Sequence, residues 1–162
     1  MRRLSLVALA VLLLDLATKA IVARRIAFRS STVRVLGDFL RLVHVKNTGS
    51  AFSLFEGGRF FFVGFSLFAI LLIVAIARSP RGRTPPYGFS LGLILGGALG
   101  NLVDRIAYGA VTDWIDAGIG VHRWPTFNVA DIGISVGVCL LAIFMLRRPR
   151  EDQAVPGSAE QS

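Results

Sequence analysis

The sequence has few of the residues that hold metals, form disulfides or act as nucleophiles in soluble enzymes. It contains a single cysteine, Cys139, and two histidines, His44 and His122. One cysteine cannot form an intrachain disulfide, and its place in an apolar run favours a small packed hydrophobe. The histidines lie far apart with no ligand spacing around them, so the sequence predicts no metal site and no cofactor. It also lacks the Gly-x-Ser-x-Gly and His-Glu-x-x-His motifs.

Charged residues are scarce as well. They make up 17% of the chain, whereas hydrophobic residues make up 54%. A soluble domain of this size could not bury so much apolar surface, which indicates a membrane protein. The net charge of +8 comes without zinc spacing, an RNP-like aromatic motif or a basic helix. We therefore expect no nucleic-acid partner. Basic clusters beside apolar segments are instead typical of contact with anionic membrane lipids.

Four apolar stretches approach the length of about 20 residues that a helix needs to cross a bilayer. They cover residues 4–23, 60–77, 87–107 and 129–146. The sequence thus predicts an all-α membrane protein with four transmembrane helices, forming a single domain over residues 1–146. Residues 147–162 are charged and polar and contain proline and glycine, which predicts a disordered cytoplasmic tail.

The first apolar stretch has an alternative interpretation as a secretory signal peptide. Two arginines precede it, and residues 21–23 resemble a cleavage site. However, Asp15 and Lys19 lie within the stretch, four residues apart. They share a helical face and can neutralise each other, which favours a retained transmembrane helix.

The basic residues also favour a membrane orientation. Their numbers on the two sides are nearly equal, so the count alone does not decide. Those near the N-terminus, in the turn at 78–83 and at 147–150 lie in short segments beside span ends, where the positive-inside rule applies best. Both termini are therefore expected in the cytoplasm. Alternating residues over 33–36 and 39–45 predict a small β-containing segment outside, between the first and second helices.

Polar residues near apolar spans are candidates for function, because each is costly in a membrane unless it is paired or used. Asn47 precedes the second span in an Asn-Thr-Gly sequence. This pattern is typical of a plain turn, and the alternative is an amide presented to a peptide substrate. In the third span, Asn101 places a further amide inside the apolar end.

The third span also carries glycines every four residues, which predict a ridge for close helix packing. Asp104 continues this row by one turn, and the neighbouring row contains Gly97, Asn101 and Arg105. The glycines of the ridge are Gly88, Gly92, Gly96 and Gly100.

Two aspartates lie where the third and fourth spans would meet if they are antiparallel. Asp113 follows the third span, and Asp131 begins the fourth. Two carboxylates that share a site cannot easily both ionise, so one can activate water while the other donates a proton. Spacing alone does not exclude Asp116 as a member of the pair. The alternatives are a small transporter or proton-conducting protein, and a non-enzymatic assembly subunit that docks through its glycines.

Five blocks together resemble the lipoprotein signal peptidase family, also called signal peptidase II. The blocks follow the family's order, and the Gly-Gly-Ala-Leu-Gly-Asn-Leu-Val-Asp-Arg block is highly specific. This resemblance implies a multi-pass aspartic endopeptidase of the bacterial inner membrane, with its active site toward the outer face. Such enzymes remove the signal peptide of a prolipoprotein by cutting before a diacylglyceryl-modified cysteine. The blocks cover residues 15–19, 47–52, 96–105, 111–114 and 127–131.

The resemblance also implies roles for individual residues. Asp113 and Asp131 would form the catalytic pair, and which of them starts protonated stays open. The implied partners are a diacylglyceryl-modified prolipoprotein, membrane lipids and an inhibitor of the globomycin type. Ser50 and Trp114 depart mildly from the family pattern. The implied substrate-binding residues are Asn47, Gly97, Asn101, Arg105 and Asn128, and the implied supporting residues are Asp15, Lys19 and Asp104.

Overall fold

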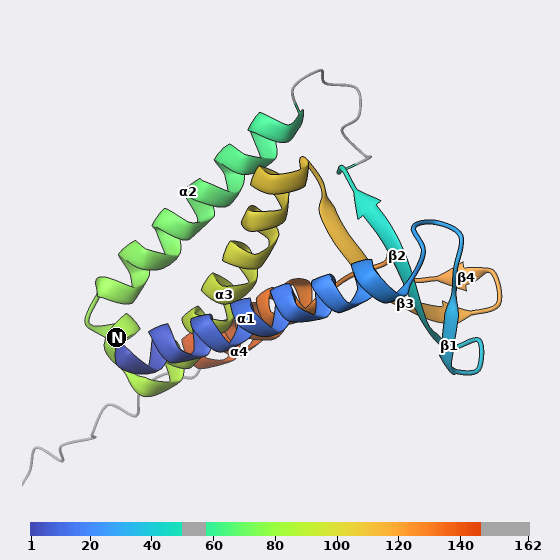
Figure 1. The fold of residues 1–162 in the computed structure, drawn as a ribbon. Coiled ribbons are helices and arrows are strands. Elements are labelled where there is room, and N and C mark those ends of the chain that lie inside the picture. The colour runs from blue at the N-terminus through green and yellow to red at the C-terminus, as the bar shows by residue number, and fades with distance from the viewer. Residues whose placement is uncertain (50–57, 147–162) are drawn as a thin grey trace, which may run out of the picture.

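The computed structural model describes residues 1–49 and 58–146, and the expected tail at 147–162 lies outside them. Four helices are long and apolar enough to cross a membrane, and a small sheet lies at one end of the bundle (Figure 1). Every predicted span boundary lies within two residues of the observed one, so the predicted fold class is confirmed. The helices are α1 (Arg2–Arg25), α2 (Gly58–Arg78), α3 (Pro85–Tyr108) and α4 (Val129–Leu146).

Local sequence explains both ends of α3. The helix begins with two prolines, which lack an N–H where the helix would leave it unpaired. It ends at Gly109, whose φ of 71° places it in the left-handed region. The N–H of Gly109 donates to the carbonyl of Arg105 at 3.0 Å. A short 3-10 turn, η2 (Arg81–Arg83), joins α2 to α3.

α3 is the central helix of the bundle. Within its apolar window 56% of the residues are buried, compared with 17% to 22% in the other three helices. Gly92, Gly96 and Gly100 face α1, where a Cβ on any of them would come within 3.0 Å of an α1 atom. Gly88 differs, since its nearest such neighbour is the carbonyl oxygen of Gly82 at 3.8 Å. The predicted ridge therefore packs on α1 through three of its four glycines.

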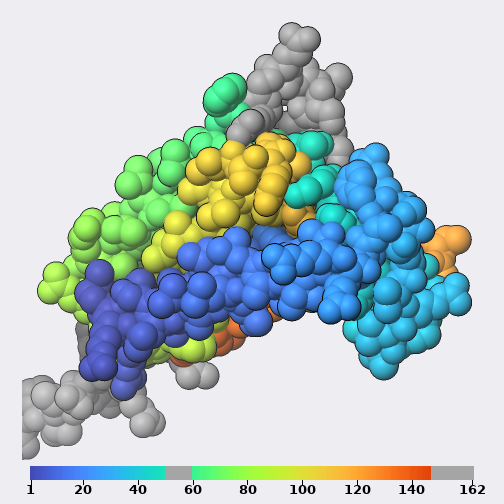
Figure 2. Space-filling model, in the orientation of Figure 1, coloured from blue at the N-terminus to red at the C-terminus, as the bar shows by residue number. Residues whose placement is uncertain are grey.

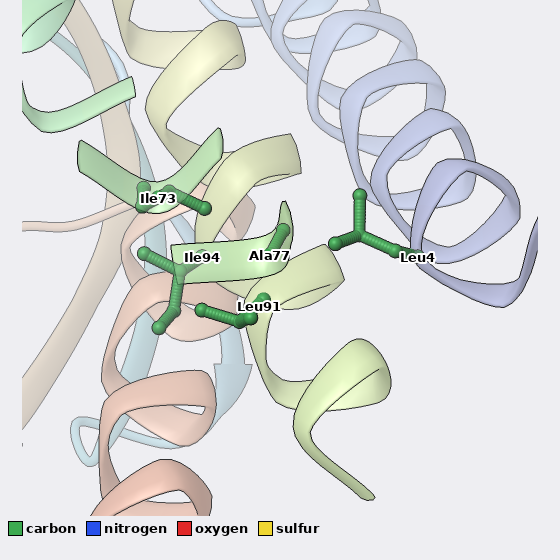
Figure 3. Close-up of a cluster of buried hydrophobic side chains, with 5 residues drawn as sticks. All are labelled: Leu4, Ile73, Ala77, Leu91 and Ile94. Atoms are coloured by element: carbon green, nitrogen blue, oxygen red, sulfur yellow. The ribbon is translucent and has the colours of Figure 1, made fainter. Parts of the chain in front are cut away.

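The apolar core lies at the end of the bundle away from the sheet. Its buried cluster joins α1, α2 and α3 (Figure 3). Many other large apolar side chains of the helices are exposed, as expected where lipid covers them. The space-filling view shows that α1 runs along the outside of the bundle to the sheet (Figure 2). The cluster contains Leu4, Ile73, Ala77, Leu91 and Ile94.

The sheet has four antiparallel strands in sequence order. Its first two strands confirm the β-containing segment predicted between the first two helices. The other two strands come from the segment between α3 and α4, where the sequence pattern did not predict them. The strands are β1 (Val33–Leu36), β2 (Leu40–Asn47), β3 (Val111–Ile119) and β4 (His122–Arg123).

Candidate active site

The segment before α4 is held against β3, which brings two distant parts of the chain together. The carbonyl of Phe127 accepts hydrogen bonds from the N–H groups of Trp114 and Ile115 at 3.0 and 2.8 Å. Its own N–H donates to the carbonyl of Ile115 at 3.1 Å. Asp113 of β3 consequently lies beside the first turn of α4, which carries Asp131.

Asn128 and Asp131 cap the start of α4 reciprocally. The N–H of Asp131 donates to Asn128 Oδ1 at 3.0 Å, and the N–H of Asn128 donates to Asp131 Oδ2 at 3.2 Å. This is the arrangement of a capping box, with asparagine and aspartate in the two positions. The Asp131 carboxylate therefore lies at a helix N-terminus, whose partial positive charge favours a negative side chain.

Asp113 receives side-chain amide donors on both of its carboxylate oxygens. Asn128 Nδ2 donates to Oδ1 at 2.7 Å, and Asn47 Nδ2 donates to Oδ2 at 2.9 Å. Asn47 reaches it diagonally across the sheet, since Asn47 pairs with Val111 and Asp113 pairs with Val45. Residues placed in this way lie on the same face of an antiparallel pair.

In addition to the hydrogen bond from the N–H of Asn128, the Asp131 carboxylate accepts a hydrogen bond from a side chain of α3. Asn101 Nδ2 donates to Asp131 Oδ1 at 2.8 Å. Each of the four carboxylate oxygens of Asp113 and Asp131 thus accepts a hydrogen bond from an asparagine. Asn128 contacts both carboxylates and is completely buried, so it fixes the two aspartates relative to each other.

The two aspartates differ in their electrostatic surroundings. Asp113 is only 2% exposed, and this burial raises its pKa to about 6. The hydrogen bonds from Asn47 and Asn128 act in the opposite direction, whereas the negative charge of Asp131 adds to the increase in pKa. Asp113 therefore keeps a proton at a higher pH than an ordinary aspartate does.

Two further residues expected from the sequence flank the pair. Arg105 donates to Ser66 Oγ of α2 at 3.4 Å and lies 5.6 Å from the centre of the Phe62 ring. Its charge interacts with both Asp113 and Asp131. Gly97 is buried against α4, where an added Cβ would meet the carbonyl oxygen of Ala130. This glycine thereby allows the first turn of α4 to lie directly on α3.

A buried ion cluster lies behind the pair. Lys19 Nζ lies 2.7 Å from Asp15 Oδ2 and 3.4 Å from Asp104 Oδ2. Asp15 Oδ1 accepts a hydrogen bond from the N–H of Ala130 at 2.9 Å, which ties α1 to α4. The expected pairing of Asp15 with Lys19 is therefore confirmed, and α1 is an integral part of the fold, as the retained-helix interpretation requires.

Asp116, which spacing left as a third candidate, lies apart from the pair. It is three residues from Asp113 along β3, so the two side chains point to opposite faces of the strand. Its carboxylate oxygens lie 2.8 and 2.6 Å from nitrogens of Arg41 and Arg123. Burial alone would raise the pKa of Asp116, but the hydrogen bonds from Arg123 and Arg41 hold it below its usual value.

A hollow of about 270 Å³ opens beside Asp131 along α4. A larger hollow of about 720 Å³ shares two of its lining residues, Trp124 and Phe127. Trp124 was not among the expected site residues, because nothing in the sequence distinguishes an apolar lining residue from a lipid-facing one. In residues 1–49 and 58–146, no three His, Cys, Asp or Glu side chains could together hold a metal ion. The smaller hollow is lined by Trp124, Phe127, Asp131, Ile132, Ser135 and Val136.

Known proteins are similar to this chain in sequence and in fold. The family described as Signal peptidase (SPase) II matches residues 7–147. A lipoprotein signal peptidase of Symbiobacterium thermophilum is 40% identical over 147 residues, covering 91% of this chain and 96% of that protein. Another lipoprotein signal peptidase, of Ralstonia nicotianae, is 43% identical over 143 residues, covering 86% of this chain and 81% of that protein. A solved structure described as a bacterial membrane enzyme has a TM-score of 0.82 at 30% identity, covering 89% of this chain and 92% of that one. The chain therefore belongs to the signal peptidase II family.

Proposed function

We propose that this protein is a membrane aspartic endopeptidase that removes the signal peptide from lipoprotein precursors, with Asp113 and Asp131 as its catalytic pair. Membership of the signal peptidase II family supports a peptidase that acts on such precursors. The observation that carries the mechanism is the pair of carboxylates held around Asn128 at the sheet end of the bundle.

The different surroundings of the two aspartates suggest a division of roles. Asp131 lies at the N-terminus of α4, whose partial positive charge favours a carboxylate, and in this proposal it takes a proton from the attacking water. Asp113, whose pKa burial raises to about 6, holds the proton of the pair. It donates this proton toward the carbonyl oxygen or the leaving amine of the scissile peptide bond.

The remaining site residues hold this pair and the peptide. Asn47, Asn101 and Asn128 direct amide N–H groups toward the carboxylates. Arg105 offsets the negative charge that the pair carries after one proton is lost, and Gly97 lets α4 approach α3. Asp15, Lys19 and Asp104 support this arrangement from behind.

The substrate we propose is a prolipoprotein whose cysteine carries a diacylglyceryl group, cut directly before that cysteine. The mostly apolar hollow beside Asp131 supports this choice, because it opens on the flank of a helix whose outer face is apolar. A lipid-bearing segment can approach such a flank within the membrane. The same hollow is where we expect an inhibitor of the globomycin type to compete.

We further propose that both termini of the 1–146 domain lie in the cytoplasm and that the sheet and the aspartate pair lie at the outer face of the inner membrane. The N-terminal arginines, Arg2 and Arg3, are the first residues of α1, and the arginines around η2 lie at the same end of the bundle. Short basic segments beside span ends stay on the cytoplasmic side.

Cleavage by the purified full-length protein tests this function. The lipidated precursor and the same precursor without lipid are incubated with the enzyme, and the products are identified by mass spectrometry. We expect one cut before the cysteine, in the lipidated precursor only, and inhibition by globomycin. Equal cleavage of both precursors, or a cut elsewhere, would contradict the proposed substrate and cut site.

A further inference from the structure

The three asparagines of the site each have an amide oxygen and an amide NH2, and each NH2 group donates to an aspartate of the pair. The orientation of each amide is set by the group on its other side. The N–H of Gly49 donates to Asn47 Oδ1 at 2.9 Å, and the N–H of Asp131 donates to Asn128 Oδ1 at 3.0 Å. Both of these donors belong to the backbone, so they are present whatever side chains surround them.

Asn101 differs, because side chains rather than backbone groups orient its amide. Asn128 Nδ2 donates to Asn101 Oδ1 at 3.2 Å, and a side chain from α1 donates to the same oxygen at a shorter distance. Lys19 Nζ donates to Asn101 Oδ1 at 3.0 Å, and Lys19 is 4% exposed. An ammonium group has three donors and no acceptor, so only the amide oxygen of Asn101 can face it. The NH2 group of Asn101 must then point the other way, to Asp131 Oδ1 at 2.8 Å.

Lys19 is itself held in place by the two carboxylates of the ion cluster. Its ammonium forms ion pairs with Asp15 and Asp104 and donates a hydrogen bond to Asn101. The two carboxylates also bind backbone N–H groups next to the catalytic pair. Asp15 accepts from Ala130, the residue before Asp131, at 2.9 Å, while Asp104 accepts from the residue before Asp113 at 2.7 Å.

We propose that Lys19 is a positioning residue for the aspartate pair, which acts by holding the amide of Asn101 with its NH2 group toward Asp131. This inference rests on the proposed function. Without the ammonium, only Asn128 Nδ2 at 3.2 Å still donates to Asn101 Oδ1, and the less firmly held amide can rotate and place its oxygen against the Asp131 carboxylate. Two acceptors then face each other unless Asp131 is protonated, and a protonated Asp131 cannot take a proton from water.

The first test is Lys19→Met, which removes the donor and its charge at similar side-chain length. We expect kcat on lipidated precursor to fall by about 10- to 100-fold, because a displacement of an active-site group by about 1 Å can cost about 100-fold in rate. We expect KM to stay within about threefold, since Lys19 lies behind the pair and away from the hollow beside Asp131. Unchanged kcat would overturn the proposal.

The pH profile gives a readout that a purely structural role would not change. Asp113 is faced by the charges of Lys19 from α1, Arg105 from α3 and Asp131 from α4, and by the amide of Asn47 from β2. The positive charge of Lys19 lowers the pKa of Asp113. Its removal should move the limb of the kcat/KM profile that reports Asp113 to higher pH. A lower maximum with an unshifted limb would overturn the proposal.

A double-mutant cycle tests whether Lys19 acts through Asn101. In an Asn101→Ala background, Lys19→Met should change kcat, measured at each variant's optimal pH, by less than about twofold, because the amide that Lys19 orients is absent. Losses that multiply would show that Lys19 acts by another route and would overturn the proposal.

Folding and the proposed function are controlled separately. If Lys19→Met does not fold, judged by thermal unfolding in detergent, the double variant Lys19→Met with Asp15→Asn takes its place in the cycle. This variant keeps the net charge of the ion cluster, and its asparagine can still accept from Ala130. Full activity of Asp113→Asn and Asp131→Asn would refute the proposed function itself. Inactivity of both, together with multiplicative losses in the cycle, would refute only the role of Lys19.

Discussion

The catalytic pair proposed here consists of two identical side chains in unlike places. Asp113 lies on the buried face of a strand, where the amides of Asn47 and Asn128 donate to it and the charge of a second carboxylate acts on it. Asp131 lies at the first turn of a helix and accepts a backbone N–H there. One proton shared by two such groups favours the buried strand position, because the helix N-terminus stabilises the charged form of the other.

The raised pKa of Asp113 predicts how activity depends on pH. If this group must be protonated, kcat/KM should fall as the pH rises through about 6. Asn47→Ala removes a hydrogen bond that lowers this pKa, so it should move the limb to higher pH while the maximum rate decreases. The measurement is kcat/KM for lipidated precursor between pH 5 and 9. A limb that moves to lower pH in Asn47→Ala would contradict Asp113 as the proton donor.

From their spacing in the sequence, Asp113, Asp131 and Asp116 were all candidates for the catalytic pair. What separates them is the register of β3 against β2, which places Asp116 opposite Arg41 and Asp113 on the other face. That register depends on residues roughly 70 positions away in sequence, so no local pattern contains it. The family resemblance selected Asp113 and Asp131, and in the structure both carboxylates accept hydrogen bonds from Asn128.

Among the elements, α3 contacts the other three helices and ends directly before the strand that carries Asp113. Its glycines allow α1 to approach closely enough for Asp15 to lie against Gly100. The same approach brings Lys19 within hydrogen-bonding distance of Asn101. Close helix packing and the geometry of the site therefore depend on the same row of small residues.

This dependence predicts different effects for two glycines of one row. In Gly96→Ala the new Cβ would come within 3.0 Å of the Ala8 backbone and the Val11 side chain, so α1 must shift. We expect a loss of about 1–3 kcal/mol in stability, the usual cost of overpacking, with reduced activity. Gly88→Ala is the matched control, since its nearest such neighbour lies at 3.8 Å. Thermal unfolding in detergent measures both, and equal midpoints would contradict the packing described for α1 and α3.

Hydrophobicity and length were sufficient to predict the four helices, because a bilayer requires long apolar stretches whatever their partners. The β1–β2 hairpin followed from alternation over residues 33–45. The sequence pattern did not predict β3, because both faces of this strand carry an aspartate and neither face is wholly apolar. It is stabilised by pairing with β2 and by the contacts of Phe127, and a strand held by such distant partners shows little period-two pattern.

At the scale of the whole molecule, the bundle has two dissimilar ends. One end carries the N-terminus and the turn between α2 and α3, and the other carries the sheet and the aspartate pair (Figure 1). The transporter alternative calls for ionisable groups spread through the membrane depth and open to a pathway. Lys19, Asp15 and Asp104 are instead buried and paired with one another, as in a static support.

The proposed orientation predicts which end faces outward. Cysteines are introduced singly at Val121, which lies in the turn between β3 and β4 and is 91% exposed, and at Ser79 in the turn after α2, in a Cys139→Ala background. A membrane-impermeant maleimide applied to intact spheroplasts should label Val121→Cys. Ser79→Cys should react only after the membrane is opened. Labelling of Ser79→Cys in intact spheroplasts would place the aspartate pair on the cytoplasmic side.

The central claim is that Asp113 and Asp131 together cleave the precursor, and the most direct test is the turnover of lipidated prolipoprotein by Asp113→Asn and Asp131→Asn. Asp38→Asn provides the matched control, because Asp38 is half exposed and pairs only with Arg41 and Arg123 among the described residues. Each variant of the pair should lose about 10²- to 10⁴-fold in kcat, as expected when a general acid or base is removed, whereas the control should keep the wild-type rate. Wild-type turnover by either folded variant of the pair would contradict the claim.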